Sequence, residues 1–522
     1  MTGDPISYLD MGDALLKGQW ASALNGYWSP LFPLIEGLAL RFLPASILSE
    51  PTVVALTQFF IFILSLCCFL FLWSRVLRLY RKQSGVFSSE KYAELSEEAL
   101  WALGYAVFLC AHLPLLLYPN PDLLLAAMTS LSGGIVLQIY LGQRHWTTFV
   151  ALGAVLALGF LTKAILLPLS LAFWLPATLA PPIDRRAFSR GTLIAAAFLV
   201  VAGPYVAALS AVQGHWTYGS AGWLNVAFHG NNVPYANWQG PPVGYGVPAH
   251  PTRQLVANPA VYEFAYPIAG TYPPWDNPTY WNQGIEPRLL VRDEAVNLGR
   301  NLVRLLTVFW PQSALLVGVA ILLLAQGRFR ETARAFLRMW YLWFPAAAAI
   351  SLYVALFVEF RYLAPFWALA WAPLFCLVRL PNHEKFRRLL KAVCLVCVTM
   401  MLFQTGRSII PDVRVAQRDA EQQVAIARGL AAFGVQPSER VAVLSGFLGD
   451  EWERLAHVSV VAEIPDADSF WAGDAARQSQ ICDLLAAHGV TTLVAKRVPD
   501  GTSPLGWRQL DGTPVYARSL RK

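Results

Sequence analysis

Charged residues are scarce in this 522-residue chain. Only 14% of its residues are Asp, Glu, Lys or Arg, and 56% are hydrophobic, whereas an ordinary soluble domain is roughly 25% charged. A chain with so little charge cannot keep most of its surface in water, which excludes a soluble globular enzyme. The net charge of +7 does not indicate nucleic-acid binding, because the basic residues lie in short loops between apolar runs. We therefore expect no nucleic-acid partner.

Cysteine is rare as well. Six of the seven cysteines lie inside apolar runs, where the thiol packs as a small apolar group. Cys482 has no evident partner in the sequence. We therefore expect neither a disulfide framework nor a metal site built on cysteine.

Long apolar runs are abundant instead. Ten of them have the roughly 17 to 25 residues that cross a bilayer. The sequence thus predicts a mainly α fold, a polytopic bundle of transmembrane helices. The two runs that meet at Thr162 and Lys163 fit either two short helices or one broken helix. The ten runs lie near 52–74, 99–118, 122–141, 146–162, 164–180, 191–210, 301–325, 339–358, 363–379 and 388–405.

Basic residues alternate strongly between the two sides of the predicted bundle. One set of short loops holds eighteen Lys and Arg residues, whereas the other set holds only Lys163 and Arg361. Because basic loops stay in the cytoplasm, this bias orients the protein in an inner (plasma) membrane. It predicts that 1–50, 211–300 and the tail after about 406 lie on the outer face. Export of 1–50 then requires either a transmembrane helix encoded before Met1 or a translocated N-terminus.

Three parts follow from this topology. Residues 1–50 form a first outer loop that carries acids, and 51–405 form the transmembrane domain, which includes a long outer loop at 211–300. That loop holds eleven prolines and twelve Trp or Tyr residues, so we expect irregular structure with a function. Its aromatic rings suit either an interfacial belt or stacking against sugar rings or a lipid.

The third part, 406–522, is predicted to be a small extracytoplasmic α/β domain. We expect a helix over 412–433 that ends at Gly434, and a hairpin turn at Asp511-Gly512. A structural or partner-docking role is favoured, because the turn at 445–449 is too weak a signal for nucleotide binding. Strands are predicted at 440–445, 458–462 and 491–496, with a helix at 474–488 before the last.

The ionisable residues on the predicted outer face are candidates for chemistry, because charges kept near a membrane are costly. A carboxylate can take a proton from an attacking hydroxyl, while cations hold a leaving phosphate. Arginine grips a phosphate with two hydrogen bonds, and lysine acts as a point charge. This combination suits a transfer reaction in which a lipid phosphate leaves. The candidates are Asp4, Asp10, Asp122, Lys163, Glu359 and Arg361.

Several of these residues also have plainer interpretations. Asp10 could serve only to orient a partner, and Asp122 could cap a helix after Pro121. Lys163 and Arg361 could extend to the membrane interface without binding substrate, and Glu359 could do no more than neutralise a cation. His250 and Arg253 are candidate contacts to an acceptor or a pyrophosphate, with ordinary loop polarity preferred. Asp13 is expected to be a solvated residue.

Three short motifs resemble those of the GT-C glycosyltransferases, the superfamily of protein O-mannosyltransferases and lipid A aminoarabinose transferases. The run from Asp4 through Tyr8 to Asp10, followed by Gly18-Gln-Trp20 and Tyr27-Trp-Ser-Pro30-Leu-Phe-Pro33, resembles that family's first outer loop. Gly159-Phe-Leu-Thr-Lys163 resembles a helix end of the family, and Glu359-Phe-Arg361-Tyr362 resembles its late Arg-Tyr motif. The likeness covers about residues 4–400.

The resemblance implies an inverting glycosyltransferase that moves a sugar from a polyprenyl-phosphate donor to a lipid, glycan or protein acceptor. Asp4 would be the catalytic base, with Asp10 beside it. Pro5 replaces the acid usual in the family at that position. Some members use a divalent cation and others do not, so metal stays open and no cofactor is assigned. The candidates for substrate binding are Tyr8, Asp122, Lys163, Glu359, Arg361 and Tyr362.

The alternative function is a transporter or flippase for a lipid-linked or anionic solute. Carriers of that kind typically show internal repeats and ionisable residues near the centres of their spans. This sequence shows no such repeat, and its outer charges gather at one face instead. The glycosyltransferase is therefore the favoured interpretation.

Overall fold

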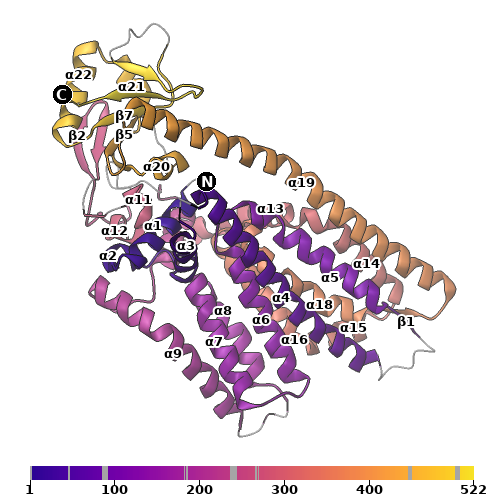
Figure 1. The fold of residues 1–522 in the computed structure, drawn as a ribbon. Coiled ribbons are helices and arrows are strands. Elements are labelled where there is room, and N and C mark those ends of the chain that lie inside the picture. The colour runs from indigo at the N-terminus through magenta and orange to yellow at the C-terminus, as the bar shows by residue number, and fades with distance from the viewer. Residues whose placement is uncertain are drawn as a thin grey trace. The chain divides into compact units, whose positions relative to one another are not determined.

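The computed structural model describes the chain except for residues 1–2, 45–46, 85–91, 182, 184–185, 235–243, 265–266, 269, 445–449, 500–505 and 522. Helices dominate it, as the sequence predicts (Figure 1). The chain forms two compact units, which we describe separately. The first contains Met1–Val54, Tyr218–Arg288 and Val413–Lys522, and the second contains Ala55–Thr217 and Leu289–Asp412.

The second unit is a bundle of apolar helices. It contains most of α4 (Glu50–Ser84), the first part of α19 (Glu384–Phe433), and all of α5 (Glu97–His112), α6 (Asp122–Tyr140), α7 (Trp146–Thr162), α8 (Leu166–Thr178), α9 (Arg186–Gln213), α13 (Val291–Phe309), α14 (Ser313–Gln326), α15 (Phe329–Arg338), α16 (Trp340–Leu356), α17 (Phe360–Leu363) and α18 (Trp367–Leu377). Helix α7 packs against α6, α8 and α9, and α16 packs against α8, α13 and α18. Strands β1 (Tyr92–Glu94) and β4 (Arg379–Pro381) pair antiparallel at one end. The fold class expected from the apolar runs is confirmed.

The number of spans differs from the ten expected. Among the described residues, seven helices are long and apolar enough to cross a membrane, or eight if the bent pair α15 and α16 counts as one. All ten predicted runs are helical. However, 146–162 and 164–180 form two short helices, α7 and α8, of 17 and 13 residues. Lys163, in extended conformation, ends α7, so the run cannot continue as one long span.

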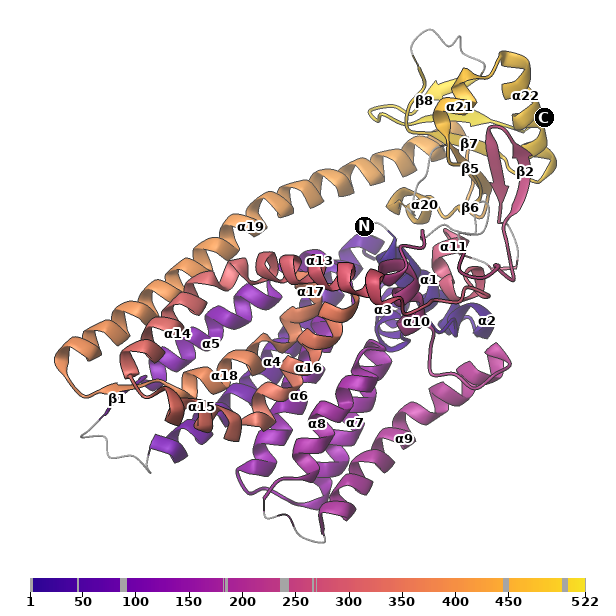
Figure 2. The ribbon, with the colours of Figure 1, turned by 180° about the vertical axis from the view of Figure 1, so that it is seen from behind.

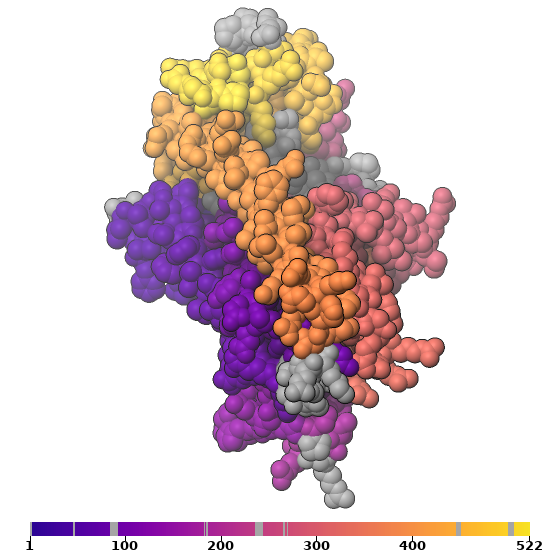
Figure 3. All heavy atoms as spheres, turned by 90° about the vertical axis from the view of Figure 1, so that its right-hand side faces the viewer, coloured from indigo at the N-terminus to yellow at the C-terminus, as the bar shows by residue number. Residues whose placement is uncertain are grey.

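Many apolar side chains of this unit face outward. In the most apolar 18-residue window of α9 only 17% is buried, and in that of α19 only 28%. Figure 3 shows the first half of α19, in orange, on the surface of the bundle. Such faces are stable only against hydrocarbon. The chain is therefore a multi-pass membrane protein.

The first unit is built on a seven-stranded sheet in the order β2-β3-β6-β5-β7-β9-β8. Its centre is parallel, with β5 (Arg440–Leu444) between β6 (Ser459–Ile464) and β7 (Thr492–Ala495). Strands β8 (Trp507–Gln509) and β9 (Tyr516–Ser519) form the antiparallel hairpin predicted around Asp511-Gly512. Helix α22 (Ala475–Ala487) precedes β7, as predicted. The predicted strands are thus confirmed, while the turn at 445–449 lies outside the described residues.

The long loop at 211–300 is not irregular throughout, and this expectation was wrong. It contributes the hairpin β2 (Arg253–Ala257) and β3 (Ala260–Glu263), and β3 pairs antiparallel with β6 (Figure 2). Short helices α11 (Pro273–Asp276) and α12 (Pro278–Trp281) follow. Sequence patterns missed the hairpin because prolines surround two strands of only five and four residues.

The helix predicted over 412–433 is the second half of α19, a single helix of 50 residues whose first half is the last apolar run. It ends where expected, because Gly434 adopts φ of 102°, a conformation that only glycine reaches without strain. The last span is thus covalently continuous with a helix of the first unit.

Helices α1 (Asp4–Leu16) and α3 (Leu31–Phe42) cross at two glycines. A Cβ on Gly12 would lie 2.5 Å from the carbonyl oxygen of Pro33, and one on Gly37 would lie 2.9 Å from that of Gly12. The backbones of α1 and α3 are in direct contact at this point, so the movement of a side chain cannot make room for an added methyl group. The position of α1, which carries the predicted catalytic acids, depends on this close approach.

We therefore expect Gly12→Ala to destabilise the first unit by about 1 to 3 kcal/mol, because the added methyl group forces the two helices apart. Gly222→Ala is the matched control, since a Cβ there meets no atom within 4 Å. Thermal unfolding of the purified protein in detergent measures both. Equal midpoints for the two variants would contradict the crossing.

Candidate functional site

Helix α1 presents the predicted acids of the first outer loop. Asp4 and Pro5 occupy its first turn, where a carboxylate is favoured by the helix dipole and a proline loses no hydrogen bond. Tyr8 is only 6% exposed, and its ring packs edge-on against Trp28 at 5.0 Å and Phe32 at 5.2 Å. Tyr8 therefore anchors α1 in the core of this unit.

The carboxylate of Asp4 is partly exposed and accepts a hydrogen bond from the indole Nε1 of Trp275 at 3.1 Å. Trp275 is itself fixed, because its carbonyl oxygen accepts from Ser7 Oγ at 3.1 Å and from Trp28 Nε1 at 3.2 Å. The indole thus orients the candidate base. Sequence reasoning identified the aromatic segment around Trp275 but gave no reason to select this residue.

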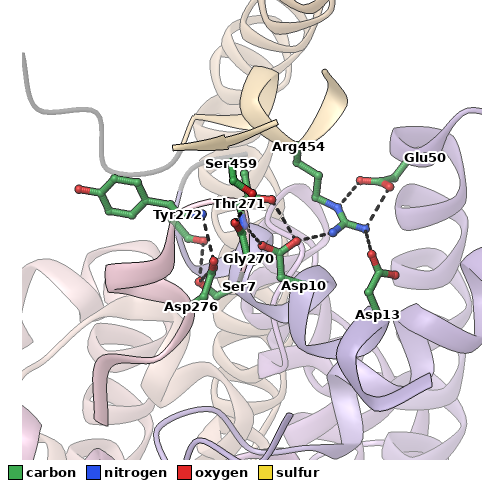
Figure 4. A network of polar contacts seen from close by, with 11 residues as sticks. Ser7, Asp10, Asp13, Glu50, Gly270, Thr271, Tyr272, Asp276, Arg454 and Ser459 are labelled. Carbon is green, nitrogen blue, oxygen red and sulfur yellow. Dashed lines mark hydrogen bonds and ion pairs between the residues drawn. The ribbon is translucent and has the colours of Figure 1, made fainter. Parts of the chain in front are cut away.

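Asp10 is held much more tightly (Figure 4). It accepts from the backbone N–H of Thr271 at 2.6 Å, from Thr271 Oγ1 at 3.1 Å, and from the guanidinium of Arg454. These contacts turn both carboxylate oxygens of Asp10 toward Thr271 and Arg454. This geometry favours the orienting role for Asp10 over the catalytic one.

A second acid, Asp276, lies close to Asp10. The sequence did not predict it as a site residue. It is buried and accepts from Ser7 Oγ at 3.3 Å and from the N–H of Tyr272 at 3.0 Å. Burial, and then the charge of Asp10, raises the pKa of Asp276 well above its ordinary value. The protonated form is therefore favoured, which avoids two adjacent charges.

The predicted cations lie in the second unit. Lys163 Nζ donates to Asp122 Oδ1 at 2.5 Å, and the side chain of Asp122 is fully buried. Asp122 is the first residue of α6, and Pro121 occupies the N-cap position; the N–H of Asp122 donates to Asn120 Oδ1 at 2.9 Å. The ion pair with Lys163, rather than a helix cap, is thus the role of Asp122 that this geometry supports.

Arg361 joins the same cluster through Tyr362. Its Nε lies 2.6 Å from Glu359 Oε2, and its Nη2 donates to the hydroxyl of Tyr362 at 3.2 Å. Lys163 Nζ lies 4.2 Å from the centroid of the same tyrosine ring, within the range of a cation–π contact. The structure therefore brings together five of the predicted residues, which we call the cation cluster: Asp122, Lys163, Glu359, Arg361 and Tyr362.

His250 and Arg253 make contacts within segment 218–288. The ring of His250 stacks on Tyr280 at 4.1 Å, and its Nε2 lies 3.0 Å from Gln283 Oε1. Arg253, whose side chain is 71% exposed, lies 3.7 Å from Glu263 on the neighbouring strand. These contacts favour the ordinary polarity that the sequence already suggested. Asp4 and Asp10 belong to the first unit and the cation cluster to the second.

Three of the first-loop acids share one cationic partner. Asp10, Asp13 and Glu50 converge on the guanidinium of Arg454, so their oxygens already surround a positive charge and do not form an open site for a divalent cation. In the part of the chain that the structure describes, no three His, Cys, Asp or Glu residues are grouped so that they could hold a metal ion.

Comparison with known proteins gives structural matches only. No protein-family model and no curated protein matches this chain. The apo oligosaccharyltransferase of Archaeoglobus fulgidus matches 94% of it at 14% identity and a TM-score of 0.45, and the chain spans 65% of that enzyme's length. ArnT from Cupriavidus metallidurans, in the apo state and bound to undecaprenyl phosphate, matches 99% at 13% identity and a TM-score of 0.42, over 93% of its own length.

Both matched proteins are GT-C glycosyltransferases, the superfamily that the sequence motifs resemble. The TM-scores are below 0.5, so this likeness does not extend to the roles of individual residues.

We expect Lys163→Met to lower the free energy of unfolding by about 3 kcal/mol, because it leaves the buried carboxylate of Asp122 without its cation. Adding Asp122→Asn should recover most of that loss, which a double-mutant cycle measures. Arg81→Met is the control, since it breaks an ion pair with Glu97 that is exposed to solvent and should therefore change the stability far less. A double variant as unstable as Lys163→Met alone would contradict the pairing.

Glu36, on α3, is a buried acid that the sequence did not flag. It is 1% exposed, and its two carboxyl oxygens have no hydrogen-bond partner among the described residues. Burial, and then the charge of Glu50, raises the pKa of Glu36 from 4.5 to about 8. The folded state therefore favours the protonated form of this residue.

Stability should consequently fall as the pH rises. The contribution of protonated Glu36 is complete below the unfolded pKa of 4.5, declines above it, and is lost as the pH passes through about 8. The slope should be about 1.4 kcal/mol per pH unit between these values. Unfolding midpoints from pH 5 to 9 test this: Glu36→Gln should flatten the profile, and Glu421→Gln, at an exposed position, should not.

Proposed function

We propose that this protein is a membrane glycosyltransferase that moves a sugar from a polyprenyl-phosphate donor to an envelope acceptor on the extracytoplasmic face. The observation that carries the proposal is the cation cluster, in which Lys163 and Arg361 meet at the ring of Tyr362. Two cations at the ends of apolar helices are costly, and such charges mark functional sites by default. The distribution of arginines in the sequence supports the extracytoplasmic orientation.

The cation cluster suits a lipid phosphate chemically. An ammonium has three donors and a guanidinium five, so cations that already hold Asp122 and Glu359 can also donate to phosphate oxygens. Their two carboxylates keep the cluster near neutral without substrate, which lowers the cost of burying it. Developing negative charge on the leaving phosphate would strengthen these hydrogen bonds in the transition state. One matched crystal contains a lipid of the class we propose, undecaprenyl phosphate in ArnT.

Asp4 is the proposed base. The acceptor hydroxyl attacks the C1 atom of the sugar, forming a new C–O bond as the bond between C1 and the phosphate oxygen breaks. The proton of the hydroxyl passes to the carboxylate of Asp4, and the bonding electrons leave with the polyprenyl phosphate. Attack opposite the leaving group inverts C1. The indole of Trp275 supports this role because it fixes one carboxylate oxygen and leaves the acid partly exposed.

Asp4→Asn should reduce sugar transfer from undecaprenyl-phosphate hexoses and pentoses by about 100- to 10,000-fold, the usual contribution of a general base. Transfer is measured with radiolabelled donors in nanodiscs. Asp483→Asn, an exposed acid on α22, should keep full activity.

Arg361→Lys should raise the KM for the donor, because lysine lacks the bidentate fork, whereas Arg334→Lys, at an exposed site on α15, should not. Movement of intact donor across vesicle membranes without transfer would support the transporter instead. Full transfer by Asp4→Asn would remove this residue from the mechanism.

A further inference from the structure

Arg454 is an unusually buried arginine on the short helix α20 (Glu451–Leu455) of the first unit. Its side chain is 9% exposed and contacts three carboxylates (Figure 4). Nε donates to Glu50 Oε1 at 2.7 Å and Nη2 to Glu50 Oε2 at 3.2 Å, a bidentate pair. Nη2 also donates to Asp13 at 3.1 Å, and Nη1 donates to Asp10. All three nitrogens of the guanidinium are used.

These contacts join distant parts of the sequence. Asp10 and Asp13 lie on α1, Glu50 begins α4, and Arg454 lies more than 400 residues later. This arrangement is stable only if its geometry is kept, because Asp10 and Glu50, whose side chains are 11% and 18% exposed, would otherwise be largely buried charges without a cation. The arginine therefore fixes α1 to the C-terminal α/β part of the chain.

The same part of the chain also holds the segment that orients Asp4. Ser459 Oγ donates to the carbonyl of Gly270 at 2.8 Å, and the N–H of Val460 donates to that of Thr271 at 2.9 Å. Thr271 in turn donates twice to Asp10. Segment 270–276 thus lies between strand β6 and helix α1, and it ends in Trp275 and Asp276.

We propose that Arg454 is a positioning residue that makes the C-terminal α/β part an integral component of the catalytic unit. Through Asp10 and Thr271 it sets where Trp275 holds the carboxylate of Asp4. This goes beyond a structural or partner-docking role for 413–522, and it rests on the proposed function of Asp4. A displaced base lowers the rate of the chemical step but leaves binding of the donor lipid unchanged.

The test compares Arg454→Lys and Arg454→Ala in the full chain in nanodiscs, with undecaprenyl-phosphate hexose as donor. We expect kcat to fall about 10-fold for lysine, which keeps the charge without the fork, and about 100-fold for alanine. KM for the donor should stay within about twofold. Arg521→Ala is the matched control, since it breaks an arginine–glutamate pair with Glu439 in the same part of the chain, and its kcat should be unchanged.

Ser459→Ala is a second test variant, to be used if Arg454→Ala does not fold. It removes one hydrogen bond to segment 270–276 and no charge, and it should also lower kcat at constant KM.

Hydrogen exchange provides a readout that does not depend on catalysis. In Arg454→Ala, amides of 4–16 and 270–276 should exchange at least about tenfold faster, while those of α22 should not change. A folded Arg454→Ala with wild-type kcat overturns the proposal. If the wild-type protein transfers no sugar, the proposed function fails. In that case exchange alone decides whether Arg454 fixes α1, and unchanged exchange in 4–16 overturns it.

Discussion

A charge removed from water must keep a partner, and this constraint shapes both units of the protein. Around Arg454, one guanidinium holds three carboxylates from two helices. Within the membrane bundle, Lys163 holds the fully buried Asp122. Each pair forces its segments into one arrangement, because moving either partner away would strand a charge in surroundings that cannot solvate it. Apolar packing alone tolerates many arrangements of helices, whereas a paired charge tolerates few.

This constraint divides the acids of the first unit into different roles. Asp10 and Glu50 use their oxygens to hold Arg454, and Asp276 is favoured in its protonated form beneath Asp10. Asp4, at the start of α1, is partly exposed and accepts a hydrogen bond from the indole of Trp275. A base needs access to substrate as well as orientation. Among the acids of α1, Asp4 best combines the two.

Motifs of the sequence selected candidate residues, but they did not indicate how those residues contact one another. Lys163 and Arg361 stood out because they alone broke the distribution of basic residues over the short loops. Their meeting at Tyr362 follows from packing of α6, α7 and the segment after α16. The sequence could not decide whether Asp122 caps a helix or belongs to the functional site, because its neighbours in the sequence are compatible with both roles. Arg454 gave no signal at all, since its partners are more than 400 residues away.

The sequence by itself determined that the chain is a helical membrane protein with an α/β part at its C-terminus. Long apolar runs and short β-branched strands are local patterns, and local patterns suffice to choose a helix or a strand. Only the tertiary structure decided that the 218–288 segment completes the C-terminal sheet, that Asp10 is a ligand of Arg454, and that Trp275 orients Asp4. These are long-range pairings. A charge or a strand edge can leave water without a large cost only if its partner is in place, and that condition is met only once the chain has folded.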